Sequence, residues 1–169
     1  MIDKETSCSF TGHRAGKLPW GFNEDDERCV LLKTRIADTV EAVYVSGVRH
    51  YICGMANGAD FYFCEAVLAL REAREDVTLE AAIPCLGQSS RWPERERRRY
   101  DRLVAQCDFQ TVVCRDYTPD CMMRRNRYMV DSSSVLIAAT GGAAGGTMNT
   151  MLYAIRQGIE LIQIPVTFS

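Results

Sequence analysis

The chain has 169 residues, of which 47% are hydrophobic and 25% charged, and its 20 basic and 22 acidic residues leave a net charge of -2. This composition is typical of a folded globular protein, and the near balance of charge argues against a nucleic-acid partner. The apolar runs are far shorter than the ~18 residues that a membrane span needs, which argues against a membrane partner. We expect one domain over residues 1–169.

The N-terminus and the cysteines both indicate a reducing compartment. The N-terminal "MIDKETSCSF" lacks the apolar core of a secretion signal, so we expect a cytoplasmic protein. Eight cysteines are present, but none are spaced as CxxC, and both histidines lie far from any paired cysteines. Most cysteines stand in apolar stretches such as "YICGM". The pattern predicts buried free thiols and no metal site.

The first half of the chain alternates strand-like and helix-like segments. Strands are predicted over residues 7–12, 49–54 and 77–84. A first helix follows the acidic run after Asn23 and closes at Gly47, with an apolar stripe formed by Cys29, Leu32, Ile36, Val40 and Val43. A second helix is predicted over residues 60–75.

The second half continues the alternation. Helices are predicted over residues 93–107, 119–133 and 147–157, the last ending at Gly158, and strands over residues 109–114, 134–140 and 160–165. This order predicts an α/β fold, a three-layer Rossmann-like domain whose mostly parallel sheet is flanked by helices. The uninterrupted apolar run "SVLIAAT" suits a sheet buried on both faces.

The stretch "GGAAGGT" joins a predicted strand to a predicted helix. It supplies Gly141, Gly142, Gly145 and Gly146, followed by Thr147. Glycines here let backbone amides approach a ligand, and the helix N-terminus adds unpaired N–H groups and a positive dipole end. We therefore predict a phosphate site, with Thr147 capping the helix or donating to a phosphoryl oxygen. The alternative is a tight turn that needs positive φ angles.

Three other segments carry polar residues toward the same predicted crevice, because ligands of open α/β sheets bind beyond the carboxyl ends of the strands. These segments are "TGHR" with Gly12, His13 and Arg14, "GMANGAD" with Gly54, Asn57, Gly58 and Asp60, and "RRN" with Arg124, Arg125 and Asn126. We expect the first to recognise phosphate or ribose and the second to line the ribose side. One of the two arginines points into the crevice, or both are at the surface.

Several residues have simpler interpretations. Asp60 is expected to be a helix N-cap, and Glu65 to be solvated or salt-bridged. The basic cluster "RWPERERRRYDR" is interpreted as a solvated helix face, with Tyr100 and Leu103 on its apolar side. Tyr51, Phe61 and Tyr62 could stack on bases, but core packing explains them better.

Two of these segments resemble known families. "GMANGAD" followed by "EAVLAL" resembles the SGxAxGxD segment of the Smf/DprA proteins, and "MMRRNRYMVDSSSVLIAATGGAAGGT" resembles the corresponding stretch of the LONELY GUY (LOG) phosphoribohydrolases. Both belong to the SLOG superfamily of Rossmann-like nucleotide-binding domains. The "TGHR" opening and the order of segments look most like its YpsA-like branch.

The departures from the LOG pattern affect the expected activity. Arg125 matches the arginine that the LOG family uses in cleaving base from ribose phosphate, but Asn126 stands at the lysine position and Thr150 at the glutamate position. Thr140 replaces the proline before the glycines. A hydroxyl cannot replace a carboxylate as general base or as stabiliser of an oxocarbenium-like centre. The resemblance with these changes implies phosphate binding without hydrolysis.

We therefore expect non-catalytic binding of a nucleotide or nucleotide derivative such as ADP-ribose, NAD or a nucleoside phosphate, with no required cofactor. One alternative is a nucleoside-monophosphate N-glycosidase with a rearranged acid/base set that uses Asp60 or Glu65. A second is a DNA-associated accessory protein resembling DprA, although the charge balance lacks the basic excess of such binding. Self-association into a homo-oligomer is a further expectation, from the related domains.

Overall fold

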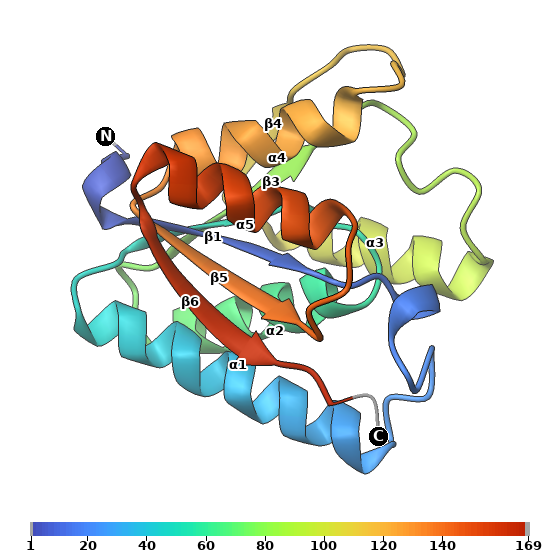
Figure 1. Ribbon diagram of the computed structural model, residues 1–169, viewed down its shortest axis with the longest axis horizontal. Helices are drawn as coiled ribbons and strands as arrows, with labels where there is room; N and C mark the ends of the chain where they lie inside the picture. Colours follow the sequence, from blue (N-terminus) through green and yellow to red (C-terminus); the bar gives the residue numbers. More distant parts are fainter. Residues whose placement is uncertain (1, 168–169) are drawn as a thin grey trace.

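The computed structural model describes residues 2–167, and its centre is a six-stranded sheet (Figure 1). The strands are β1 Ser7–Gly12, β2 His50–Cys53, β3 Thr78–Ile83, β4 Phe109–Val112, β5 Val135–Thr140 and β6 Glu160–Pro165. Every neighbouring pair is parallel, in the order β4-β3-β2-β1-β5-β6. The chain therefore builds the sheet outward from β1 in one direction, then returns to the other side of β1 with β5.

Helices cover both faces of this sheet, as Figure 1 shows. The first three, α1 Glu27–Val45, α2 Ala59–Ala73 and α3 Glu94–Gln106, pack in a row on one face. On the other face lie α4 Cys121–Asp131 and α5 Gly146–Gln157. Two short 3-10 turns, η1 Lys4–Thr6 and η2 Ala15–Lys17, complete the described elements. The predicted three-layer α/β fold is confirmed.

Hydrophobic periodicity explains why the helices form where they do. The five residues of the predicted α1 stripe are the ones that this helix buries. On α3, Tyr100 and Leu103 are buried, while Arg98 is exposed and pairs with Glu94 one turn earlier at 2.7 Å. The helix α5 ends at Gly158 in the left-handed region, as predicted. Tyr51, Phe61 and Tyr62 are buried in the core, which confirms their packing role.

Burial across the sheet follows the strand order. All residues of β2 and β5 are buried, as are those of β1 except its last, whereas the edge strands β4 and β6 are mostly exposed or half-buried. Most of the apolar core lies between the sheet and the α1–α2 layer. Among the helices of residues 2–167, none combines the length and the apolar character that a membrane span requires.

Gly58 fixes the spacing between the β1 and β2 loops. It stands immediately before α2 with φ at +89°, and a Cβ built there would lie 2.5 Å from the backbone nitrogen of Ala15. The amide of Ala59 donates to the carbonyl of His13 at 3.1 Å, which ties α2 to the end of β1. Only glycine combines this backbone conformation with so close an approach.

We predict that Gly58→Ala lowers the free energy of unfolding by about 2–3 kcal/mol, because it adds a clash with the β1 loop to the strain of a positive φ. Gly47→Ala is the matched control: Gly47 also has a positive φ, but a Cβ there meets nothing within 4 Å. For this control the free energy of unfolding should fall by only about 1 kcal/mol, because Gly47→Ala adds the strain of a positive φ but no clash. Urea titrations of both variants measure the difference, and equal losses would contradict the crowding at Gly58.

Candidate functional site

A cavity of about 270 Å³ opens where the strand order reverses, between the ends of β1 and β5. Ligands of open α/β sheets bind at this switch point. Residues from four parts of the chain form the wall of this cavity. They are Phe10, Thr11 and Gly12 at the end of β1 with His13, Arg14 and Lys17 after it, Ala56 and Asp60 around the start of α2, Met122, Arg125, Asn126 and Met129 on α4, and Ala144, Gly145, Gly146 and Thr147 around the start of α5. The topology thus brings together segments that lie far apart in the sequence.

Backbone amides form one side of the cavity. Among the described residues, the N–H groups of residues 143–148 have no hydrogen-bond partner, whereas the amide of Asn149 donates to the carbonyl of Gly145 at 2.9 Å. Gly142 and Gly145 both have positive φ angles, so the backbone can turn without straining a side chain. The first turn of α5 therefore offers unpaired donors and the positive end of the helix dipole.

His13 positions this loop from the neighbouring strand. Its Nε2 lies 3.3 Å from the amide nitrogen of Gly141 and 3.5 Å from the Thr140 hydroxyl. The bond from Gly141 requires an unprotonated Nε2. Burial, followed by the charge of Lys17, lowers the pKa of His13, which favours that neutral form at pH 7. His13 therefore holds the start of the glycine loop at Gly141, independently of any contact that it makes with a ligand.

Arg125 is the buried cation of the site. Its side chain donates to the carbonyls of Gly54 and Ala82, at the ends of β2 and β3, and its Nε donates to Asn126 Oδ1 at 2.9 Å. Burial lowers its pKa and the nearby Asp60 opposes that shift, but a guanidinium stays charged at any physiological pH. Arg124, one position earlier, is exposed, so the structure distinguishes the two arginines that the sequence could not.

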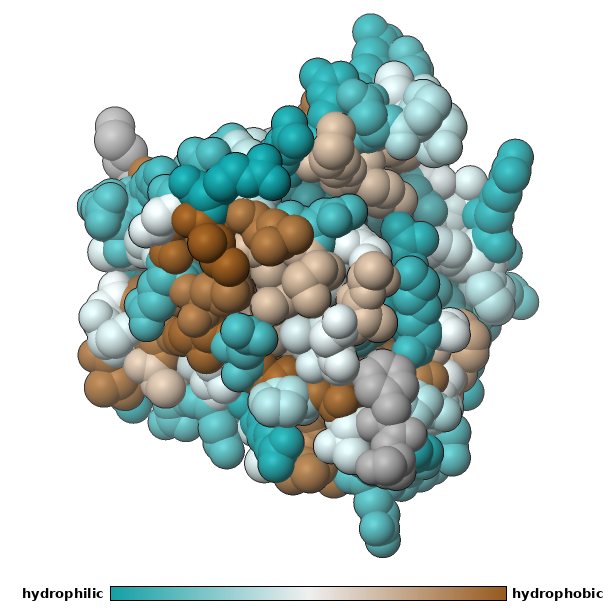
Figure 2. Space-filling view, in the orientation of Figure 1, coloured by the Kyte–Doolittle hydropathy of each residue, from teal (hydrophilic) through white to brown (hydrophobic). Residues whose placement is uncertain are grey.

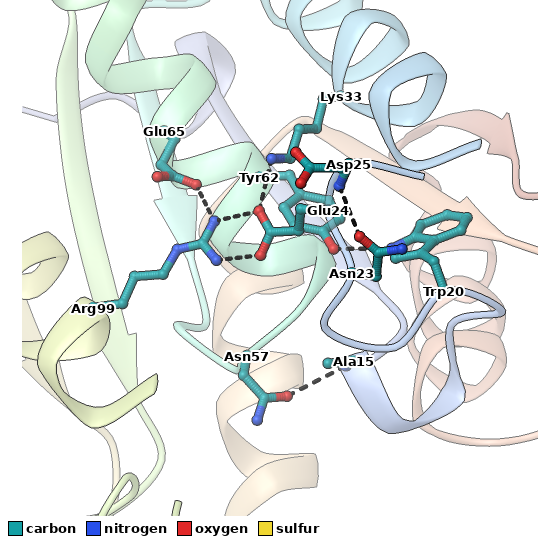
Figure 3. Close-up of polar contacts among 10 residues, drawn as sticks. All are labelled: Ala15, Trp20, Asn23, Glu24, Asp25, Lys33, Asn57, Tyr62, Glu65 and Arg99. Carbon is teal, nitrogen blue, oxygen red and sulfur yellow. Dashed lines mark hydrogen bonds and ion pairs between the residues drawn. The ribbon is translucent and has the colours of Figure 1, made fainter. Parts of the chain in front are cut away.

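Gly54 makes room for this guanidinium. A Cβ at that position would lie 2.6 Å from Arg125 Nη1 and 2.7 Å from Cζ. Gly54 does not line the cavity, and neither do Asn57, Gly58, Gly141 or Gly142. These five predicted site residues shape the walls, for example through Asn57 Oδ1, which accepts from the amide of Ala15 at 3.4 Å (Figure 3).

Asp60 lies in the cavity wall and is not the helix N-cap. Gly58 occupies the cap position, because the helix begins at Ala59, and the Asp60 carboxylate instead accepts from the amide of Ala56 at 3.0 Å. Burial raises the pKa of Asp60 to about 6, against the opposing charges of Arg125 and Arg14. The N-cap expectation was wrong because the loop before α2 folds back over its first turn.

The capping role predicted for Thr147 is wrong, whereas its alternative role as a donor to a phosphoryl oxygen stays a prediction. Thr147 is the second residue of α5 and does not cap it; Gly145 stands at the cap position and has no side chain to do so. The Thr147 hydroxyl instead lies in the cavity wall without a partner among the described residues. Thr150, at the position of the LOG glutamate, is 3% exposed and donates its hydroxyl to the Gly146 carbonyl at 2.8 Å.

Glu65 lies outside the cavity, in a charged network between α1, α2 and α3. Glu65 accepts from Arg99 at 2.5 Å, while Arg99 also pairs with Glu24, which in turn accepts from Lys33 at 2.7 Å. Figure 3 shows how these side chains face one another. The prediction that Glu65 is salt-bridged is confirmed. Because Glu65 pairs with Arg99 in this network and does not line the cavity, it cannot act on a ligand bound there.

The sequence did not single out every residue of the wall. Lys17 is exposed at the rim, and its Nζ lies 3.4 Å from where a Cβ on Gly145 would be. The apolar part of the wall includes Met122 and Met129 of α4. Lys17 carries a weak sequence signal, since it follows "TGHR" by three residues, but only the 3-10 turn over Ala15–Lys17 directs it back to the glycine loop.

A second hollow, of about 450 Å³, lies between α4 and α5 and shares Met122, Asn126 and Gly146 with the cavity. It is mainly apolar, with Met123, Leu152 and Tyr153 among its lining residues. Figure 2 shows a band of apolar surface over α5, the helix that carries the exposed Leu152 and Ile155. The polar cavity thus opens beside an apolar surface.

Comparison with known proteins identifies the family to which the chain belongs. The model of the YspA SLOG family matches residues 8–165. The chain belongs to this family. Among curated relatives, a UPF0398 protein of Bacillus pumilus is 23% identical over 162 residues, covering 95% of this chain and 85% of its own length. The UPF0398 protein YpsA of Bacillus subtilis is also 23% identical over 162 residues, covering 95% and 89%.

Solved structures share the fold of this YspA SLOG domain. DNA processing protein A (DprA) from Streptococcus pneumoniae aligns with a TM-score of 0.64 at 16% identity, over 97% of this chain and 52% of that one. DprA from Helicobacter pylori aligns with a TM-score of 0.65 at 16% identity, over 99% and 69%. The chain therefore spans about half of the pneumococcal protein.

The raised pKa of Asp60 makes the stability of this SLOG domain depend on pH. A buried acid whose folded pKa exceeds its unfolded value contributes most stability below about pH 4, and loses it as the pH rises through about 6. We predict that the free energy of unfolding of the wild type, relative to Asp60→Asn, falls by up to about 3 kcal/mol between pH 4 and pH 7. Urea titrations across this range measure it. If the difference in the free energy of unfolding between the wild type and Asp60→Asn does not change with pH, the raised pKa of Asp60 is contradicted.

Proposed function

We propose that this protein binds a nucleotide or nucleotide derivative without hydrolysing it, and that the phosphate lies against the amides of residues 143–148. The observation that supports this best is the set of unpartnered N–H groups, within the described part of the chain, beside an open cavity. The first N–H groups of a helix have no partner within the helix, and they carry the positive end of its dipole. Where such groups border an open cavity, an anion is the partner that suits them best.

The side chains of the wall favour the same ligand. Arg125 lies at the base of the cavity, while the exposed Arg14 and Lys17 stand at its rim. Cations near unpaired amides strengthen each hydrogen bond to a phosphate oxygen. The hydroxyl of Thr147 adds a further donor. In this proposal Asp60 and the residues beside it face the sugar of the bound nucleotide.

Hydrolysis is not part of the proposal because a catalytic carboxylate is missing where the LOG reaction needs one. The hydroxyl of Thr150 is held by the Gly146 carbonyl, and Glu65 pairs with Arg99. Asp60 is the carboxylate that lines the cavity. A glycosidase acting at this cavity would depend on Asp60, and the assays below separate that function from binding.

The test is a calorimetric and thermal-shift screen of AMP, other nucleoside monophosphates, NAD and ADP-ribose. We expect at least one to bind and to raise the melting temperature, since a ligand at ~100 times its Kd adds about 2.7 kcal/mol of stability. Gly146→Leu should weaken that binding at least tenfold, because position 146 borders the cavity and a Cβ there meets nothing within 4 Å. Gly16→Leu, another open position that does not line the cavity, is the control.

Two results would overturn the proposal. One is the absence of binding by every nucleotide at millimolar concentration. The other is release of free base from a bound monophosphate, detected by chromatography, together with its loss in Asp60→Asn. A single-stranded oligonucleotide belongs in the same screen, because the Helicobacter pylori DprA structure concerns the single-stranded DNA binding mode of that protein. Tight oligonucleotide binding with no nucleotide binding would favour the DNA-associated alternative.

A further inference from the structure

We infer that the cavity selects the dianionic phosphomonoester of a hydroxylated sugar over pyrophosphate-bridged ligands, and that Asp60 provides this selection by accepting hydrogen bonds from sugar hydroxyls. The inference rests on the proposed function and narrows it to one class of ligand. It would place nucleoside monophosphates and sugar phosphates ahead of NAD and ADP-ribose.

The charges of the wall match one dianion. Three cations line the cavity, Arg14, Lys17 and Arg125, against the single carboxylate of Asp60. The lowered pKa of His13 keeps its ring neutral at pH 7. The ionised side chains that line the cavity therefore carry a net charge of about +2. A phosphomonoester, whose second pKa is about 6, concentrates nearly two negative charges on one phosphate at pH 7, whereas a pyrophosphate diester spreads its two charges over two phosphates. The difference therefore lies in the charge on a single phosphate and not in the total charge of the ligand.

The carboxylate of Asp60 distinguishes a sugar phosphate from a bare anion. One of its oxygens accepts from the Ala56 amide, and within residues 2–167 no group donates to the other. An ionised carboxylate is acceptor-only, so it repels a phosphate oxygen but accepts from an alcohol. Because the residue is 6% exposed and lines the cavity, a hydroxyl that reaches it is shielded from competing water.

The size of the cavity points to the same class. Its volume of about 270 Å³ lies just below the ~300–1,000 Å³ typical of pockets for drug-sized ligands. One phosphate and one sugar fit such a space, whereas a dinucleotide has two of each. A base attached to the sugar would leave the cavity on the side shared with the α4–α5 hollow, where Met122 and Gly146 form the common wall.

Isothermal titration calorimetry at pH 7.5 tests the inference with four ligands: ribose 5-phosphate, AMP, ADP-ribose and methyl phosphate. Methyl phosphate carries the same dianion without sugar hydroxyls. We expect ribose 5-phosphate and AMP to bind at least tenfold more tightly than either ADP-ribose or methyl phosphate. In Asp60→Asn the advantage of ribose 5-phosphate over methyl phosphate should fall below about threefold, with methyl phosphate bound as tightly as before or more so.

Asp38→Asn is the matched control, because Asp38 is an exposed carboxylate on α1 outside the cavity. It should leave all four affinities unchanged. If ADP-ribose binds as tightly as AMP, or if Asp60→Asn keeps the wild-type preference, the inference is overturned while nucleotide binding stands. If none of the four ligands binds, the proposed function fails as well. Should Asp60→Asn not fold, the wild-type ranking of the four ligands decides the question by itself.

Discussion

The burial of the Arg125 guanidinium constrains everything around the cavity. Taking a charge of this kind out of water costs several kcal/mol unless other groups solvate it. Carbonyls at the ends of β2 and β3 and the carboxylate on α2 do so here, and Arg125 itself comes from α4. One side chain therefore joins α4 to the sheet through hydrogen bonds, and its charge is balanced by the carboxylate on α2. The cavity keeps its shape because moving any of these elements would leave a buried cation unsatisfied.

The architecture could be predicted from the sequence because it depends on local patterns. The α1 stripe, the glycine at the end of α5 and the apolar run of β5 each indicate an element through residues a few positions apart. Strict alternation of strands and helices then leaves a parallel sheet as the natural arrangement. The glycine loop was predicted for the same reason, since a strand, four glycines and a helix are adjacent in the chain.

The details of the cavity could not be predicted because they depend on contacts between distant residues. Nothing near Arg125 in the sequence distinguishes it from Arg124; the carbonyl partners lie 71 and 43 positions away. The role of His13 depends on an amide 128 positions later. Asp60 looked like a helix cap, since its side chain suits one, and only the fold of the preceding loop directs it to Ala56. Composition and spacing contain none of this information.

The contact between Gly54 and Arg125 links two positions in evolution. Because the guanidinium occupies the space where any side chain at position 54 would begin, a lineage that replaces this glycine must also give up the arginine or shift α4. The converse substitution removes the guanidinium from the carbonyls of Gly54 and Ala82 and leaves unfilled the space that it occupied beside Gly54. Relatives should therefore either keep the pair intact or change both members together, so drift at one position is limited by the other.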